Sequence, residues 1–140
     1  MLVLTVSLIA CTFTSTSTNN EKDKDAAEKV AKKLFELLKN KNYDAADTLF
    51  SDSMWVVSTK EKLKKLFVYS DNKLGDMRSD SLADWNTRIT SGTTNSAEYQ
   101  LIYKNHYQKG VADINIVLTQ EKGKIKILGY HINSDAFLAK

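Results

Sequence analysis

The chain has 140 residues, of which 42% are hydrophobic, 26% charged and 9% aromatic. This length fits one domain, and the apolar fraction is too high for a wholly disordered chain. One cysteine and two histidines exclude a disulfide scaffold and a zinc-finger ligand set. The net charge of +3, from 20 basic and 17 acidic residues, is too small to indicate binding to nucleic acid.

The first eleven residues carry no charged side chain and are mostly apolar. A stretch of about ten residues makes about 15 Å of helix, half the thickness of a bilayer core, so it does not span a membrane. Its length matches the apolar part of a signal peptide, which we expect over residues 1–10. No Lys or Arg precedes the apolar part, which departs from the usual signal-peptide pattern.

The quartet Leu8-Ile9-Ala10-Cys11 resembles the lipobox of bacterial lipoproteins. The resemblance implies that signal peptidase II cuts before Cys11 and that the Cys11 thiol carries a diacylglycerol, so that the protein takes up palmitate. Two or three acyl chains give a stable membrane anchor, which one chain alone does not. We therefore expect Cys11 to be the lipid attachment site. The alternative is an apolar N-terminus with an inert thiol on a cytosolic protein.

Residues 12–20 are rich in Thr, Ser and Asn and contain one apolar residue. Such a segment buries too little surface to fold, so we expect the lipidated Cys11 and a flexible polar tether over residues 11–20. The tether would hold the domain about 15–20 Å from the anchor. A single domain is expected over residues 21–140.

Helical periodicity runs over residues 23–40, and a short second helix is expected over residues 43–50. A third helix is expected to open at Ser58, with Glu61 in the capping-box position, and to end at Gly75.

After Gly75 the apolar period changes to two. It predicts strands over residues 81–90, 99–103, 112–118 and 124–132, with a bulge or bend at Gly129, where the apolar phase flips. The predicted fold class is therefore α+β, with three N-terminal helices packed on a curved antiparallel sheet of about four strands.

The order of these elements resembles a known superfamily. A long helix, a short helix over 42–46, Trp55, an amphipathic helix ending at Gly75 and the strands 98–103 and 123–132 look like small secreted bacterial proteins of the nuclear-transport-factor-2-like superfamily. They are similar to an uncharacterised group whose members are often lipoproteins. The usual tryptophan before the closing Gly-Tyr is replaced here by aliphatic residues. The resemblance implies a cone with an apolar pocket, which enzymes and binding modules both use.

An enzyme of that superfamily needs Asp, His or Tyr side chains facing the cone. The chain offers seven such residues: Asp113, His106, His131, Tyr99, Tyr103, Tyr107 and Tyr130. Asp113 falls on the polar side of its strand and His106 near a turn, so we expect both at the surface, while the bend at Gly129 is expected to turn His131 outward. The chain has no catalytic-triad spacing, glycine-rich phosphate loop or His-x-x-x-His pair. We therefore expect no catalytic residue, metal or cofactor.

Four aromatic residues are candidates for ligand contact, because their rings offer area at low entropic cost. They are Trp55, Trp85, Tyr99 and Tyr103. The alternative is that they fill the core.

The sequence thus predicts a non-enzymatic binding module of the bacterial cell envelope, anchored in a membrane through lipid at Cys11. Its partner would be an apolar small molecule or an envelope protein. The anchor would place the domain on the outer face of the cytoplasmic membrane or on an outer membrane. The alternatives are a small enzyme of the same fold, with a cone-facing Asp, His or Tyr as general acid or base, and a module that dimerises through the outer face of its sheet.

Overall fold

The computed structural model describes residues 14–139, and Cys11 and the predicted signal peptide lie outside them. One six-stranded antiparallel sheet has the order β1-β3-β4-β5-β6, and β2 pairs with β4. Its strands are β1 (Ser15–Thr18), β2 (Met77–Ser79), β3 (Leu82–Ser91), β4 (Ser96–Tyr107), β5 (Gly110–Glu121) and β6 (Lys124–Asn133). The helices are α1 (Glu21–Lys39), α2 (Tyr43–Ala46), α3 (Met54–Val57) and α4 (Lys60–Leu74), with 3-10 turns η1 (Asp47–Leu49) and η2 (Asp135–Leu138).

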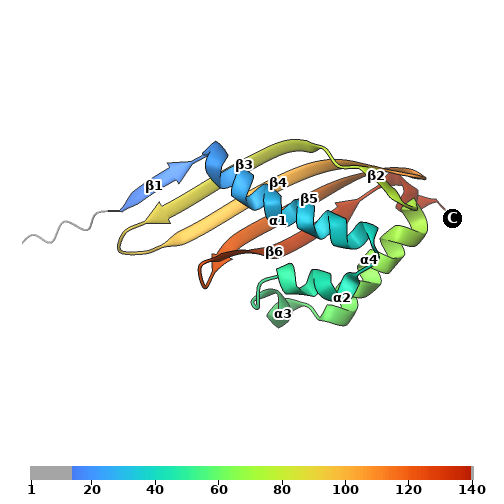
Figure 1. The fold of residues 1–140 in the computed structure, drawn as a ribbon, viewed down its shortest axis with the longest axis horizontal. Helices are drawn as coiled ribbons and strands as arrows, with labels where there is room; N and C mark the ends of the chain where they lie inside the picture. Colours follow the sequence, from blue (N-terminus) through green and yellow to red (C-terminus); the bar gives the residue numbers. More distant parts are fainter. Residues whose placement is uncertain (1–13, 140) are drawn as a thin grey trace, which may run out of the picture.

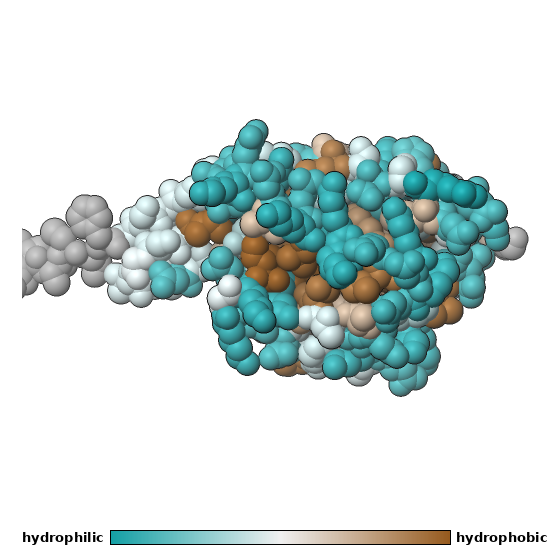
Figure 2. Space-filling view, in the orientation of Figure 1, coloured by the Kyte–Doolittle hydropathy of each residue, from teal (hydrophilic) through white to brown (hydrophobic). Residues whose placement is uncertain are grey.

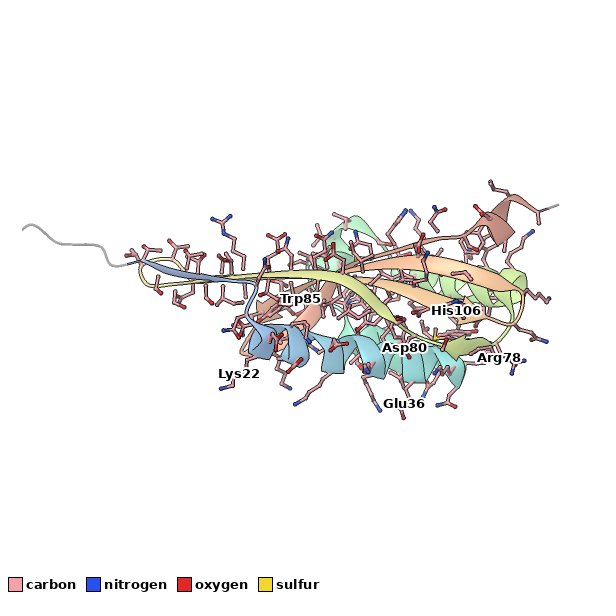
Figure 3. The ribbon with its side chains drawn as sticks, turned by 90° about the horizontal axis from the view of Figure 1, so that it is seen from above. Lys22, Glu36, Arg78, Asp80, Trp85 and His106 are labelled. Carbon is pink, nitrogen blue, oxygen red and sulfur yellow. The ribbon has the colours of Figure 1, made fainter. Side chains whose placement is uncertain are left out.

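The helices lie on one face of the sheet, and α1 runs along the strands but begins well short of the β3–β4 hairpin (Figure 1). Seen along its edge, the sheet has α1 on one side, while on the other side its side chains project away from the helices (Figure 3). The predicted α+β class is therefore confirmed. The predicted element counts are too low, because the short elements β1, β2 and α3 were not expected as separate elements.

Helix α1 forms where the sequence shows three- and four-residue apolar steps. Five side chains on one stripe are buried: Ala27, Ala31, Leu34, Phe35 and Leu38. The Asn20 side chain caps the helix by accepting from the Lys22 N–H at 2.9 Å. The buried side chains pack against the sheet, and the opposite face of this amphipathic helix faces solvent.

Helix α4 begins one residue later than the capping-box pattern suggests. Thr59, not Ser58, is the N-cap, and its hydroxyl accepts from the Lys62 N–H at 3.1 Å. The helix ends at Gly75 as expected, where φ is +73°. The positive φ favours glycine, and a Cβ there would lie 2.9 Å from Oε1 of Gln108, whose side chain would have to shift.

The sheet buries alternate residues of its two longest strands. The inward side chains are Ala97, Tyr99, Leu101, Tyr103, Asn105 and Tyr107 from β4, and Ala112, Ile114, Ile116 and Leu118 from β5. In β6 the pairing shifts between Val117 and Leu118 of its neighbour, which leaves Leu128 as an extra residue beside Gly129. The bulge turns Ile127 and Tyr130 to the same side, which confirms the phase flip predicted at Gly129.

Part of the segment expected to be a flexible tether is a strand. Ser15–Thr18 pairs with β3, from Ser15 opposite Ser91 to Thr18 opposite Arg88. All four residues of β1 are exposed, so backbone hydrogen bonds hold the strand without buried apolar surface. The prediction of a tether over 11–20 is therefore wrong from Ser15 onward, and the folded unit begins before residue 21.

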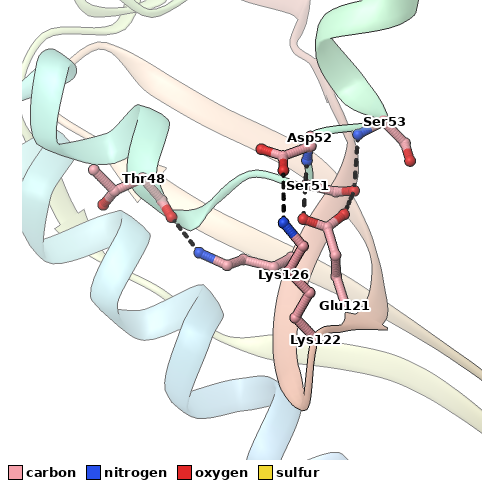
Figure 4. Close-up of polar contacts among 7 residues, drawn as sticks. All are labelled: Thr48, Ser51, Asp52, Ser53, Glu121, Lys122 and Lys126. Atoms are coloured by element: carbon pink, nitrogen blue, oxygen red, sulfur yellow. Dashed lines mark hydrogen bonds and ion pairs between the residues drawn. The ribbon is translucent and has the colours of Figure 1, made fainter.

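A carboxylate holds the segment before α3 against the β5–β6 hairpin (Figure 4). Glu121 accepts from the Ser51 hydroxyl and, at 3.2 Å, from the Asp52 N–H. The Ser51 hydroxyl oxygen in turn accepts from the Ser53 N–H at 3.1 Å. These donors favour the charged carboxylate, the Ser51 hydroxyl most of all, and hold the pKa of Glu121 below its usual range.

We expect Glu121→Gln to lower the unfolding midpoint at neutral pH and to reduce its loss in acid. A carboxyl with a lowered folded-state pKa adds stability above its unfolded-state pKa of about 4.3, and this stability is lost as pH falls through the folded-state pKa. Urea unfolding of both proteins from neutral pH to about pH 3 measures the difference. Glu98→Gln, an exposed carboxylate on β4, is the control. Parallel acid profiles for wild type and Glu121→Gln would contradict the assignment.

Candidate functional site

A cavity of about 130 Å³ lies where the C-terminal end of α1 meets α4, β2 and the inner face of the sheet. Its walls come from elements far apart in the sequence, so only the folded chain forms it. The lining residues are Leu38, Lys39, Lys41, Phe67, Ser70, Asp71, Asp76, Met77, Tyr107 and Tyr130.

The polar side of the cavity centres on Asp71 of α4. Its carboxylate accepts from the Tyr43 hydroxyl and pairs with the Lys41 ammonium at 3.2 Å. Lys41 also approaches Asp76 at 3.8 Å. The Asp71 side chain is 18% exposed, against 47% for Lys41 and 72% for Asp76. The carboxylate of Asp71 therefore lies deeper than the two charges at the rim.

The apolar side of the cavity is aromatic. The rings of Phe67 and Tyr130 meet edge to face, with centroids 5.4 Å apart, and Tyr107 is buried at the end of β4. Burial raises the pKa of Tyr130 and of Tyr107 above the ordinary phenol value, and the charge of Asp71 adds to both. Both phenols are therefore neutral at physiological pH and can donate a hydrogen bond.

Tyr43 is kept neutral in the same way. Burial raises its pKa first, and the hydrogen bond to Asp71 raises it further. A phenol with a raised pKa is a poor general acid or base near neutral pH, since efficient proton transfer needs a pKa near the working pH. Tyr107 and Tyr130 line the cavity and are suited to hold a ligand by hydrogen bonds, whereas the Tyr43 hydroxyl already donates to Asp71.

A buried acceptor without a partner lies beside the cavity. Asn105 is fully buried, and its amide donates to the sulfur of the cavity-lining Met77 at 3.6 Å. Within residues 14–139, its Oδ1 atom accepts no hydrogen bond. Such an atom costs about 1–3 kcal/mol when desolvated.

The four aromatic residues predicted to contact ligand do not line this cavity. Tyr99 and Tyr103 are 2% and 1% exposed and belong to the core, where the Tyr103 ring meets Phe35 edge to face at 4.9 Å. Trp85 is half-buried under the Lys24 ammonium, 5.6 Å from its ring, and Trp55 under that of Lys60 at 5.4 Å. Their positions fit the alternative that these rings pack the protein.

Of the residues weighed as candidate bases, Tyr107 and Tyr130 line the cavity, whereas the carboxylate and the two histidines lie away from it. Asp113, His106 and His131 are all exposed, as expected, and none of them lines the cavity. Asp113 lies 4.0 Å from the Lys104 ammonium on the outer face of the sheet. Across residues 14–139, no group of three or more His, Cys, Asp or Glu side chains is placed to hold a metal ion.

Tyr107 and Tyr130 were candidates from the sequence, but nothing in it indicated that they would meet the other lining residues in one cavity. Tyr107 and Tyr130 continue the inward alternation of their strands at the end where α1 stops, after Lys39. An aromatic residue beyond the covering helix is less fully packed than one beneath it. The sequence indicated this position only through two lengths: β4 extends past the end of α1, so its last aromatic residue is not covered by that helix.

The fold and the site define an α+β protein with a small, partly aromatic cavity between its helices and one end of its sheet. Within residues 14–139, no helix is long and apolar enough to cross a membrane. A scan against protein-family models found no matching model, and searches of curated proteins and of solved structures found no match. The function is therefore argued from the residues of this chain alone.

Proposed function

We propose that this protein is a bacterial envelope lipoprotein, anchored through lipid at Cys11, whose domain binds a small molecule without converting it. The observation that carries the binding role is the cavity beside Tyr107 and Tyr130. The lipobox resemblance of residues 8–11 carries the anchor. A long helix crossing a sheet over a cavity also supports our proposal that the domain is nuclear-transport-factor-2-like.

The size and chemistry of the cavity limit the ligand class. An apolar cavity of about 150 Å³ holds one benzene molecule, so a volume of about 130 Å³ fits a group of roughly one ring. Phe67 and Tyr130 would contact its flat faces and edges. Asp71 would meet a cationic or hydrogen-bonding group, which would replace the half-exposed Lys41 ammonium. The ligand we propose is therefore a small, largely apolar molecule with an amine or hydroxyl at one end.

We expect benzylamine to bind more tightly than toluene, because only the amine gains the Asp71 carboxylate. Titration of the ¹⁵N-labelled protein should shift the amide signals of Phe67, Ser70 and Tyr130. Ser70→Leu fills part of the cavity and should weaken binding about tenfold, which corresponds to about 1.4 kcal/mol. Asn72→Leu, at an exposed position of the same helix, is the matched control.

Met77→Trp fills the cavity from β2 and keeps the test valid if Ser70→Leu does not fold. Binding that is equal in wild type and in both filled variants would contradict the proposal.

The second candidate is a small enzyme of the same fold. The observation that favours it is Asp71, a carboxylate on the cavity wall of the kind that serves as a general base. Mass spectrometry of the incubated ligand distinguishes the two. A product made by the wild type and not by Asp71→Asn would establish the enzyme, whereas unchanged ligand supports the binding protein.

A further inference from the structure

We propose that the domain stands end-on at the membrane, with the β3–β4 hairpin in the lipid headgroup layer and the cavity at the opposite, water-facing end. The proposal rests on the lipid anchor at Cys11 put forward above. Beyond the anchor itself, this orientation specifies which surface of the domain faces the membrane and from which side a ligand enters the cavity.

The chain between the anchor and the folded domain is short. Only residues 12–14 separate Cys11 from Ser15, the first residue paired in the sheet. Four steps along an extended chain span at most about 14 Å. Beyond β1, the Asn19 N–H donates to the Thr87 carbonyl at 2.9 Å and the Asn20 N–H to the Thr87 hydroxyl at 3.1 Å. A lipidated Cys11 therefore holds this end of the sheet at the membrane surface.

The end of the sheet nearest the anchor carries polar residues without charge. Ser15 lies opposite Ser91, where β3 enters the hairpin to β4. In a chain that is 26% charged, residues 15–18 and 91–96 hold no charged residue and only Ser, Thr, Gly and Asn. The end is mostly pale in Figure 2, whereas the rest of that face is mostly teal. Hydroxyl and amide groups can bond to lipid phosphate and ester oxygens without the cost of desolvating a charge.

The next hairpin favours the same surface. The β5–β6 turn carries Lys122 and Lys124, and Lys122 lies with Asn95 and Ser96 around one shallow pocket between the two hairpins. Lys122 pairs with Asp52 at 3.7 Å, but both are more than three-quarters exposed. Lysines beside a charge-free tip are placed to meet lipid phosphates once the tip reaches them.

The cavity lies at the end of the domain opposite the β3–β4 hairpin. Helix α1 has 19 residues, which at 1.5 Å each make about 28 Å, and the cavity lies at its far end. Strand β4 spans about 36 Å from Ser96 at the hairpin to Tyr107 on the cavity wall. Both elements run along the long axis of the molecule (Figure 1). The ligand thus enters from water, not from the bilayer that holds the anchor.

The test uses three single-cysteine additions to the full lipoprotein, whose own Cys11 is blocked by lipid: Thr93→Cys at the β3–β4 hairpin, Val57→Cys on α3 and Lys109→Cys at the β4–β5 turn. All three positions are exposed. Each protein is labelled with a fluorescent dye and placed in phosphatidylcholine vesicles that contain lipids with a nitroxide on the headgroup, a short-range quencher. We expect the dye at Thr93 to lose most of its emission and the dye at Lys109 to lose almost none.

Equal quenching at Thr93 and Lys109, or stronger quenching at Val57 than at Thr93, would overturn the end-on orientation. The mass of the same samples reports the lipid at Cys11 independently. A lipidated protein without selective quenching at Thr93 overturns this inference alone, whereas a protein without lipid overturns the anchor and the orientation with it.

Discussion

Cys11→Ser should abolish palmitate labelling and release the protein from the membrane fraction. A thioether bond to diacylglycerol requires the Cys11 sulfur, and serine has no thiol to replace it. The loss should be nearly complete, because surface charge gives only about 1 kcal/mol per well-placed lysine, far less than two or three acyl chains. The gene should be expressed in a bacterium with its native upstream region, and the protein followed by radiolabelled palmitate and by fractionation.

The control for this experiment is Ser15→Ala, which keeps the lipobox resemblance of residues 8–11 and changes an exposed position of β1. It should label and fractionate as the wild type does. Equal labelling of wild type and Cys11→Ser would contradict lipid attachment at Cys11.

Phe35→Ala should lower the free energy of unfolding by about 3–5 kcal/mol, the usual cost of removing a buried phenylalanine ring. Phe35 is 1% exposed, and its ring meets Tyr103 edge to face at 4.9 Å. It therefore joins α1 to the inner face of the sheet. Domains of this size are stable by about 5–15 kcal/mol, so the variant should unfold at much lower urea concentration.

Val68→Ala is the matched control, since Val68 on α4 is 38% exposed and its truncation should change stability by no more than about 0.5 kcal/mol. Urea unfolding followed by circular dichroism measures both variants. A loss below about 1 kcal/mol for Phe35→Ala would mean that α1 does not pack on the sheet as described.

The parts of the fold that were predictable are those in which burial repeats with a fixed period. The alternation of Ala112, Ile114, Ile116 and Leu118 marks a strand with one buried face, and the stripe of α1 marks a helix. The bulge beside Gly129 was also readable, because an extra residue must reverse the apolar phase of a strand that keeps one face buried.

Strand β1 could not be predicted, because it has no buried side chain. Its Ser and Thr residues are exposed and gain backbone hydrogen bonds from the edge of β3. An apolar pattern records burial and not backbone pairing, so a polar edge strand looks like a linker. The predicted tether was therefore too long, because the chain is already paired in the sheet at Ser15, and the domain lies closer to Cys11 than expected.

The candidate site was harder to predict than the fold. Tyr99, Tyr103 and Tyr107 follow the same alternation on β4, and nothing in their spacing tells which of them is covered by α1. Packing decides: the first two lie beneath the helix, and Tyr107 lies beyond its end, beside the cavity. Asp71 gave no signal either, since its partners Lys41 and Tyr43 reach it only in the folded chain.

The most direct test of the central claim, that this domain is held at a membrane through Cys11, is the mass of the mature N-terminal peptide. Protein extracted from the membrane fraction with detergent and digested with protease should give a peptide that begins at Cys11 and carries the added mass of a diacylglycerol. A peptide that retains residues 8–10, or one that begins at an unmodified Cys11, would contradict the account.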